Sequence, residues 1–229
     1  MKRVSLCFAT ALLFSTCGCA RLHSAEPIEA WVIDEETGEP IEGAVVVAHW
    51  QSEIHTMGGR IAGKQVMVVE TVSDVKGRFH FSAWGPKVSA SGAIEEKSPE
   101  LLLFKPGYEY RRVANEIGGD QRNSFTRRSS WNAKKISLKR RLAPSAEELG
   151  NLNSDLRFIV LREVGACNWR STPKTILAVQ RYRRALAEFG QPLRGWETVD
   201  QELVQNAHYY SQETSARCGR PQDVIKGLQ

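Results

Sequence analysis

The sequence predicts an α+β fold in which a β-rich N-terminal part is followed by helices. Short runs rich in Val, Ile and Phe, separated by turn signals, dominate the chain before Arg141, and helix-capping patterns dominate after Pro144. The 229 residues are 41% hydrophobic and 25% charged, an ordinary globular composition that is long enough for one large or two modest domains. This composition excludes a chain that is disordered throughout.

Seven strands are predicted in the N-terminal part. Thr37 to Pro40 forms a turn between two apolar runs, and Ser73 to Gly77 forms a second turn in which Asp and Gly fit a hairpin. The spacing predicts an antiparallel β-sandwich. Its strands are Ile28–Ile33, Ala44–Gln51, Gln65–Thr71, Arg78–Ser82, Leu101–Lys105, Tyr108–Val113 and Lys134–Leu138.

Two of these strands are apolar on both faces. Ala44 to Ala48 and Leu101 to Phe104 contain no alternation of apolar and polar residues. A strand that faces water on one side alternates, so both are expected to be central strands whose outer face is covered. The C-terminal region is the available cover.

About three helices are predicted in that region. Ser145 and Glu148 form a capping box, and Leu149, Leu152 and Leu156 follow at helical spacing. A second helix is expected from Thr172-Pro173 to Gly190, and a third opens at Thr198–Gln201.

Three segments resemble a known family. They are Asp34-Glu35-Glu36-Thr37-Gly38-Glu39-Pro40-Ile41-Glu42-Gly43-Ala44-Val45-Val46, Ser73-Asp74-Val75-Lys76-Gly77-Arg78-Phe79-His80-Phe81 and Lys105-Pro106-Gly107-Tyr108. This pattern resembles the carboxypeptidase regulatory-like domain, a prealbumin-like (transthyretin-like) β-sandwich, over about residues 26 to 141. The resemblance implies an accessory and binding module of envelope and secreted proteins. Two enzyme groups share the topology, but the chain lacks the terminal Tyr-Arg-Gly-Ser of the hydroxyisourate hydrolases and the paired Tyr/His metal set of the intradiol dioxygenases.

The N-terminus has the pattern of a secretory signal. Lys2 and Arg3 precede an apolar run from Val4 to Phe14, which is too short to span a bilayer as a permanent helix. Thr16-Cys17-Gly18-Cys19 then resembles the bacterial lipobox, although Thr16 and Cys17 stand where Leu and a small residue are preferred. Lipidation of Cys19, cleavage after Ala20 or Ala25, and an uncleaved anchor remain open, and all three imply export. The predicted division is a signal peptide at 1–19, a tether at 20–27, the sandwich at 28–141 and the helical region at 142–229.

The cysteines predict one disulfide bond in the mature protein. Cys7 and Cys17 leave with the signal and Cys19 carries lipid, so Cys167 and Cys218 remain in an oxidising compartment. A Cys167–Cys218 bond closes a loop of about fifty residues, which stabilises the fold by about 4 kcal/mol in the chain-entropy model. Two free buried thiols or a metal pair are the alternatives.

A basic segment is the strongest functional signal. The net charge is +5, and ten Lys/Arg lie between Arg111 and Arg141 against Glu116 and Asp120. The segment fits an anionic lipid surface, an acidic glycan or an acidic envelope protein, whereas nucleic acid is excluded for an exported chain. The alternative is a solvated loop and edge strand in which charge discourages aggregation. The candidate binding residues are Arg111, Arg112, Arg127, Arg128, Trp131, Lys134 and Lys135.

No catalytic, metal or cofactor site is predicted. His49, Glu53, His55, Glu70 and His80 have the right chemistry for metal ligands, but they lack the spacing of a known site. The sequence has no nucleophile elbow and no phosphate-binding loop. The inserts 49–64 and 84–99 are expected to be loops at an end of the sandwich, where binding usually resides.

These observations favour a non-catalytic lipoprotein of the bacterial cell envelope, held to a membrane on its periplasmic face and acting as a binding or assembly module. An inhibitor or immunity-type protein that blocks an envelope enzyme or toxin through a long loop is the alternative. A small hydrolase or metal enzyme is a third, and it requires the His and acidic residues to converge.

Overall fold

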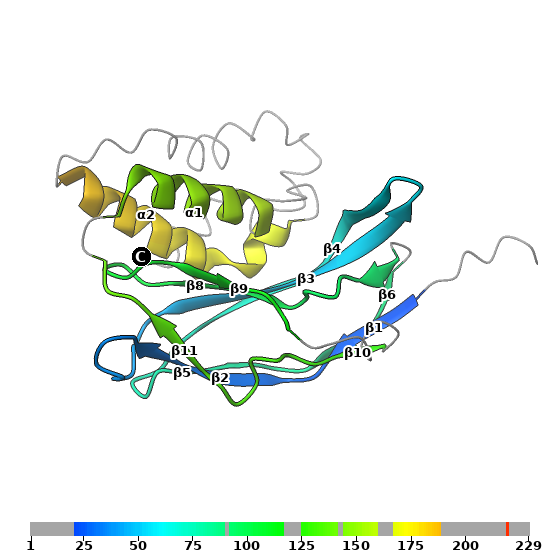
Figure 1. The fold of residues 1–229 in the computed structure, drawn as a ribbon, viewed down its shortest axis with the longest axis horizontal. Coiled ribbons are helices and arrows are strands. Elements are labelled where there is room, and N and C mark those ends of the chain that lie inside the picture. The colour runs from blue at the N-terminus through cyan, green and yellow to red at the C-terminus, as the bar shows by residue number, and fades with distance from the viewer. Residues whose placement is uncertain are drawn as a thin grey trace, which may run out of the picture.

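The computed structural model describes residues 21–89, 92–116, 125–141, 144–159 and 167–188, and Gly219 (Figure 1). The α+β class is confirmed. The described residues form eleven strands in three sheets, two α-helices and a short 3₁₀-helix at Asn168–Ser171. The helices, a five-stranded sheet and a three-stranded sheet lie in three successive layers.

The five-stranded sheet is built around two central strands. Its order is β4-β3-β8-β9, and β7 pairs with the outer part of β3. The central pair aligns Val46 with Leu103 and Val47 with Leu102, so the apolar runs predicted to be central are adjacent. The bounds are β3 Val45–Thr56, β4 Gly59–Val72, β7 Ala93–Ile94, β8 Glu100–Phe104 and β9 Arg111–Val113.

A three-stranded sheet faces this one and completes the sandwich. It has the order β11-β2-β5, formed by β2 Ile28–Asp34, β5 Arg78–Phe81 and β11 Lys135–Leu138. The two sheets enclose a core because alternate side chains of each point inward. From one sheet come Val46, Ala48, Leu101 and Leu103, and from the other Ala30, Val32, Phe79, Phe81, Ile136 and Leu138.

The third sheet was not predicted. It has the order β10-β1-β6, formed by β1 Arg21–Ala25, β6 Trp84–Ser89 and β10 Thr126–Arg127. Most of the expected tether at 20–27 is therefore strand β1. Its burial alternates, with Leu22 exposed and His23 and Ala25 buried, but Arg21–Ala25 contains no β-branched or aromatic residue to mark it as a strand.

Three expectations about the β part are corrected. All seven predicted strands exist, but β1, β6, β7 and β10 are additional, and β11–β2 and β1–β10 are parallel rather than antiparallel. The expected loop at 49–64 is a continuous hairpin, because the β3–β4 ladder runs on to the pair Thr56 and Gly59. Gly63 permits the close approach, since a Cβ there would lie 2.4 Å from the Ser52 hydroxyl. The expected loop at 84–99 contains β6 and β7.

Two helices cover the outer face of the five-stranded sheet, as predicted (Figure 1). Helix α1 spans Ala146–Ile159 and α2 spans Pro173–Glu188. The capping box is present: the Ser145 hydroxyl accepts the Glu148 N–H at 3.1 Å, and the Glu148 carboxylate accepts the Ser145 N–H at 2.6 Å. The helix expected from Thr198 lies outside the described residues. The layer between helices and sheet contains Val47, Val68, Leu102 and Phe104 from the sheet and Leu149, Leu152, Leu156, Ile159, Ile176, Leu177, Val179 and Tyr182 from the helices.

Two polar side chains of β4 hold the ends of both helices. The Glu70 carboxylate accepts the N–H groups of Lys174 at 2.6 Å and Thr175 at 2.8 Å, at the start of α2. The Gln65 amide donates to the carbonyl of Ile159, the last described residue of α1, at 2.7 Å. Helix termini leave such backbone groups without intrahelical partners, and a carboxylate at the N-terminus also complements the helix dipole. The sheet therefore fixes the helices by polar contacts as well as by apolar packing.

Replacing Glu70 tests this attachment. Glu70→Ala removes the cap of α2 and should lower the free energy of unfolding by about 1–2 kcal/mol, measured by urea denaturation. Glu70→Gln keeps an acceptor without the charge and should lie between Glu70→Ala and the unmodified protein. Glu42→Ala, which removes an exposed carboxylate from a turn, is the matched control. An equal effect of Glu42→Ala and Glu70→Ala would contradict this account of the helix attachment.

Candidate functional site

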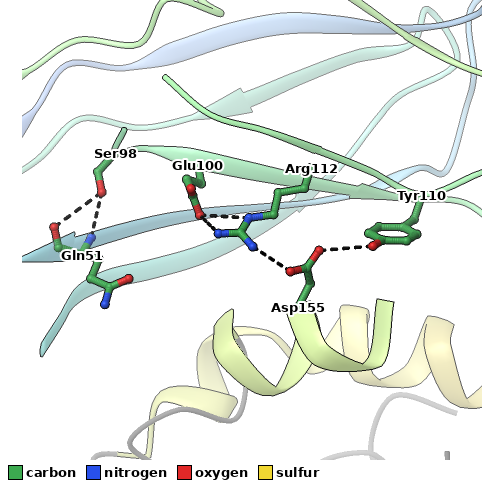
Figure 2. A network of polar contacts seen from close by, with 6 residues as sticks. All are labelled: Gln51, Ser98, Glu100, Tyr110, Arg112 and Asp155. Atoms are coloured by element: carbon green, nitrogen blue, oxygen red, sulfur yellow. Dashed lines mark hydrogen bonds and ion pairs between the residues drawn. The ribbon is translucent and has the colours of Figure 1, made fainter. Parts of the chain in front are cut away.

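A network of charged side chains lies between the five-stranded sheet and α1 (Figure 2). Arg112 of β9 donates through Nη2 and Nε to Glu100 of β8, at 2.5 and 3.0 Å, and through Nη1 to Asp155 of α1 at 2.7 Å. The Tyr110 hydroxyl donates to the other Asp155 oxygen at 3.3 Å. Beside these four residues, the hydroxyl of Ser98 accepts the backbone N–H of Gln51 at 3.0 Å. We call Arg112, Glu100, Asp155 and Tyr110 the Arg112 network.

The electrostatics of the Arg112 network favour a structural role. Partial burial disfavours the charged guanidinium, but the hydrogen bond to Glu100 and the nearby charges raise the pKa of Arg112 overall. Burial and the neighbouring Asp155 carboxylate raise the pKa of Tyr110. At neutral pH Arg112 is therefore charged and Tyr110 is neutral, and both donate hydrogen bonds to the carboxylates of the network.

The apolar border of the network includes one of the candidate metal ligands. The ring of Phe158 lies 5.7 Å from the Arg112 guanidinium and contacts the His49 ring edge-on at 5.9 Å. His49 is 1% exposed, on the sheet face under the helices. His49 therefore packs against Phe158 beneath the helices.

The five candidate metal ligands do not meet. His49 is buried near α1, Glu70 caps α2, and His80 is exposed on β5. Glu53 and His55 lie on the outer part of β3, joined at 3.2 Å. Across the part of the chain that the structure describes, no group of three His, Cys, Asp or Glu residues is arranged to hold a metal ion.

The predicted basic patch is divided among separate places. The Arg112 side chain is 35% exposed and makes the contacts of the Arg112 network. Arg127 is 2% exposed and donates to the carbonyl of Ile94, and burial lowers its pKa. Arg111 donates to the Ser137 carbonyl at 2.9 Å. Arg127 is therefore buried within the fold, whereas Arg111 and Arg112 make contacts within the fold and remain exposed.

The other four members of the patch are Arg128, Trp131, Lys134 and Lys135. Arg128 is exposed and pairs with Glu26 at 2.8 Å. The Trp131 indole donates to the Ala114 carbonyl at 2.7 Å, and the Lys134 ammonium lies 5.6 Å from the centre of its ring. Lys135, the first residue of β11, is exposed. Trp131, Lys134 and Lys135 therefore form a small cationic surface at the edge of the sandwich.

Asp34 is a buried charged site that was not among the predicted functional residues. Its side chain accepts the N–H groups of Glu36 and Thr37 at 2.9 and 3.0 Å, the Tyr108 hydroxyl at 3.1 Å and the Arg140 Nε at 2.6 Å. The residue is 1% exposed, and its hydrogen bonds, led by the one from Thr37, hold its pKa well below the usual range. Asp34 thus joins the end of β2 to Tyr108 and to Arg140.

One niche opens between the β8–β9 connection and the helices. Its volume is about 10 Å³, and Tyr108, Tyr110 and Tyr182 line it together with Glu109 and Glu148. Such a space holds about one water molecule, whereas sites for organic ligands are many times larger. It is not a substrate pocket in this conformation.

The predicted cysteine sites are only partly within the described structure. Cys19 and Cys218 lie outside the described residues. Cys167 is disulfide-bonded, and the identity of its partner as Cys218 stays a prediction. None of the described helices is long and apolar enough to cross a membrane.

No protein-family model matches the sequence, and neither does any curated protein. Among solved structures, wild-type catechol 1,2-dioxygenase from Acinetobacter radioresistens is similar at 15% identity and a TM-score of 0.32, and a single-residue variant of it at 16% and 0.33. Each similarity covers 54% of this chain and 55% of the dioxygenase chain, so this chain spans about half of that enzyme's length. A 9R-lipoxygenase from Cyanothece PCC8801 is similar at 13% identity and a TM-score of 0.26, over 83% of this chain and 27% of the lipoxygenase. Similarities this low carry no conclusion about activity.

The Asp34 site predicts a specific acid sensitivity. Because the folded-state pKa of Asp34 is lowered, its stabilising contribution is present above the pH at which the unfolded carboxyl titrates, about 4, and is lost as the pH falls further. Asp34→Asn should therefore lower Tm most at neutral pH, and its Tm should approach that of the unmodified protein toward pH 2.

Tyr108→Phe removes one of the four donors to Asp34 and serves as the graded control. It should lower Tm less than Asp34→Asn at pH 7. A loss of Tm in Asp34→Asn that is the same at pH 7 and pH 2 would show that the charge of Asp34 does not stabilise the fold.

Proposed function

We propose that this protein is a non-catalytic lipoprotein of the bacterial cell envelope, held to a membrane through Cys19, whose folded part is a binding or assembly module. The signal-like N-terminus and the lipobox-like segment before Cys19 support export and lipidation. The turn motifs that resemble the carboxypeptidase regulatory-like domain support a module that binds rather than catalyses.

The main support for this proposal is that the best-defined charged side chains make contacts within the fold. The three best-defined polar sites, at Asp34, Glu70 and Arg112, each join elements that are distant in sequence. An active site instead presents acid, base or nucleophile to a space where substrate fits. Because these side chains hold strands and helices together, we infer that the function is performed by the outer surface.

The cationic surface of Trp131, Lys134 and Lys135 is the part of the predicted patch that fits a partner. Aromatic and basic side chains together suit an acidic envelope protein, an acidic glycan or anionic lipid. The ligand of the module is expected among these three classes.

Intact-mass analysis of protein purified from its own membranes tests the anchor. We expect a diacyl or triacyl mass on Cys19, and non-reducing peptide mapping should recover a Cys167–Cys218 cross-link. Cys19→Ser should move the protein from the membrane fraction to the soluble fraction. Cys17→Ser, which brings the segment closer to the lipobox pattern, is the control and should remain membrane-bound.

An unlipidated chain that begins at Arg21 or Glu26 would contradict the proposal. The protein would then be a soluble exported protein, and a stoichiometric complex with an envelope enzyme or toxin would favour the inhibitor hypothesis.

A further inference from the structure

Exposed apolar side chains gather at one end of the molecule. Among the described residues, the large apolar side chains that are exposed are Leu22, Ile54, Met57, Ile61, Val75, Val88 and Phe125. All except Val75 lie on or beside β1, β6 and the outer part of the β3–β4 hairpin, which share the end where the chain enters β1 (Figure 1). We call this the apolar end. Val75 lies in the turn between β4 and β5, at the opposite end.

Three of these side chains surround the start of β1. Leu22 and Val88 are directly opposite each other across the β1–β6 pair, and they are 48% and 70% exposed. Phe125 is 69% exposed and is held beside β1, because its carbonyl accepts the Ser24 N–H at 2.9 Å. Leu22 and Val88 therefore form an exposed apolar pair on one face of this sheet, and Phe125 adds an exposed apolar side chain at its edge.

The other three lie on the projecting part of the β3–β4 hairpin. Ile54 and Ile61 are opposite each other across the ladder and are 42% and 52% exposed. Met57 at the turn is fully exposed. Isolated exposed apolar residues are normal, but paired ones at the tip of an extended arm indicate a contact surface.

The hairpin and the β1–β6 pair are fixed to each other. The rings of Trp50 and Trp84 pack edge to face at 5.4 Å, and the Lys87 ammonium lies 3.0 Å from the sulfur of Met67. His23 of β1 also contacts the segment just before β7, which pairs with β3: its Nε2 lies 3.1 Å from the carbonyl oxygen of Gly92. The base of the hairpin is therefore packed against the β1–β6 pair, and the tip projects from this junction.

The exposed charges on the hairpin and β6 are basic, and the carboxylates beside them are partly buried. Arg60, Lys64 and Lys87 are exposed, whereas the Glu53 side chain is 13% exposed and pairs with His55 and Arg60, and Glu95 and Glu96 after β7 are half-buried. Lysine and arginine beside exposed apolar groups suit the head-group region of an anionic bilayer. A second copy of the same surface would instead bring like charges together.

The place of Cys19 in the sequence, just before β1, favours a membrane as the partner of this surface. Strand β1 begins at Arg21, two residues after Cys19, and two extended residues span at most about 7 Å. We propose that the apolar end lies against an anionic bilayer, with Leu22, Val88 and the hairpin tip at Met57 in its interface. This inference rests on the proposed lipid anchor. The anchor then sets the orientation of the whole sandwich, because Ala20 is the one residue between Cys19 and β1 in the sequence.

The test uses the full-length lipoprotein purified from its own membranes and reconstituted into vesicles of phosphatidylethanolamine and phosphatidylglycerol. An environment-sensitive fluorophore is placed at Val88→Cys or, as the matched control, at Val75→Cys, two exposed valines at opposite ends. Lipids with brominated acyl chains should quench the label at position 88 several-fold more than the label at position 75. A label at Met57→Cys should behave like the one at position 88.

A charge variant adds a second readout. Leu22→Glu should markedly reduce quenching of the position 88 label without changing flotation of the protein with the vesicles, because the lipid remains. Val75→Glu should change neither quenching nor flotation.

The outcomes separate this inference from the proposed function. Protein that carries acyl groups and floats with vesicles, but shows equally weak quenching at positions 88 and 75, would overturn the orientation and leave the lipid anchor intact. Concentration-dependent dimers without quenching would assign the apolar end to a second copy and also overturn it. Protein without acyl groups that does not float would overturn the proposed function, and this inference with it.

Discussion

The fold depends on one pair of strands that is apolar on both faces. Val46 and Leu103 point into the sandwich, and their neighbours Val47 and Leu102 point outward under the helices. A sheet with two apolar faces must be covered on both sides, because each exposed apolar face costs free energy in proportion to its area. The smaller sheet provides one cover and helices α1 and α2 provide the other.

Polar contacts then fix the positions of the helices on the sheet, which apolar packing alone does not determine. Apolar burial is non-directional and does not set how far a helix slides along a sheet. Glu70 fixes the start of α2, and Arg112 with Asp155 fixes α1 on the edge strand β9. Asp34 performs the same task inside the sandwich by joining β2 to Tyr108 and Arg140. These charged groups thus fix the positions of strands and helices.

The sequence predicted well those elements that depend on local or strongly periodic signals. The two-sided runs at Val46 and Leu103 indicated central strands and a helical cover, and Ser145 with Glu148 marked the start of α1. The sequence did not predict the features that depend on contacts between residues distant along the chain. Arg21–Ala25 is a strand only because β6 and β10 lie beside it, and Arg127 leaves the basic patch because the fold buries it. The acceptor for Arg112 on α1, Asp155, lies 43 residues away along the chain, which no local pattern reveals.

Under the proposed function, a lipid on Cys19 orients the sandwich on a membrane. Amide hydrogen exchange tests it most directly, comparing the lipoprotein in anionic vesicles with the soluble Cys19→Ser chain. The account predicts slower exchange in vesicles at the hairpin turn around Met57 and at the β1–β6 edge, with no change at Val75. Slowing at Lys134 and Lys135 instead, with the hairpin unaffected, would show that the cationic edge faces the membrane and would contradict the account.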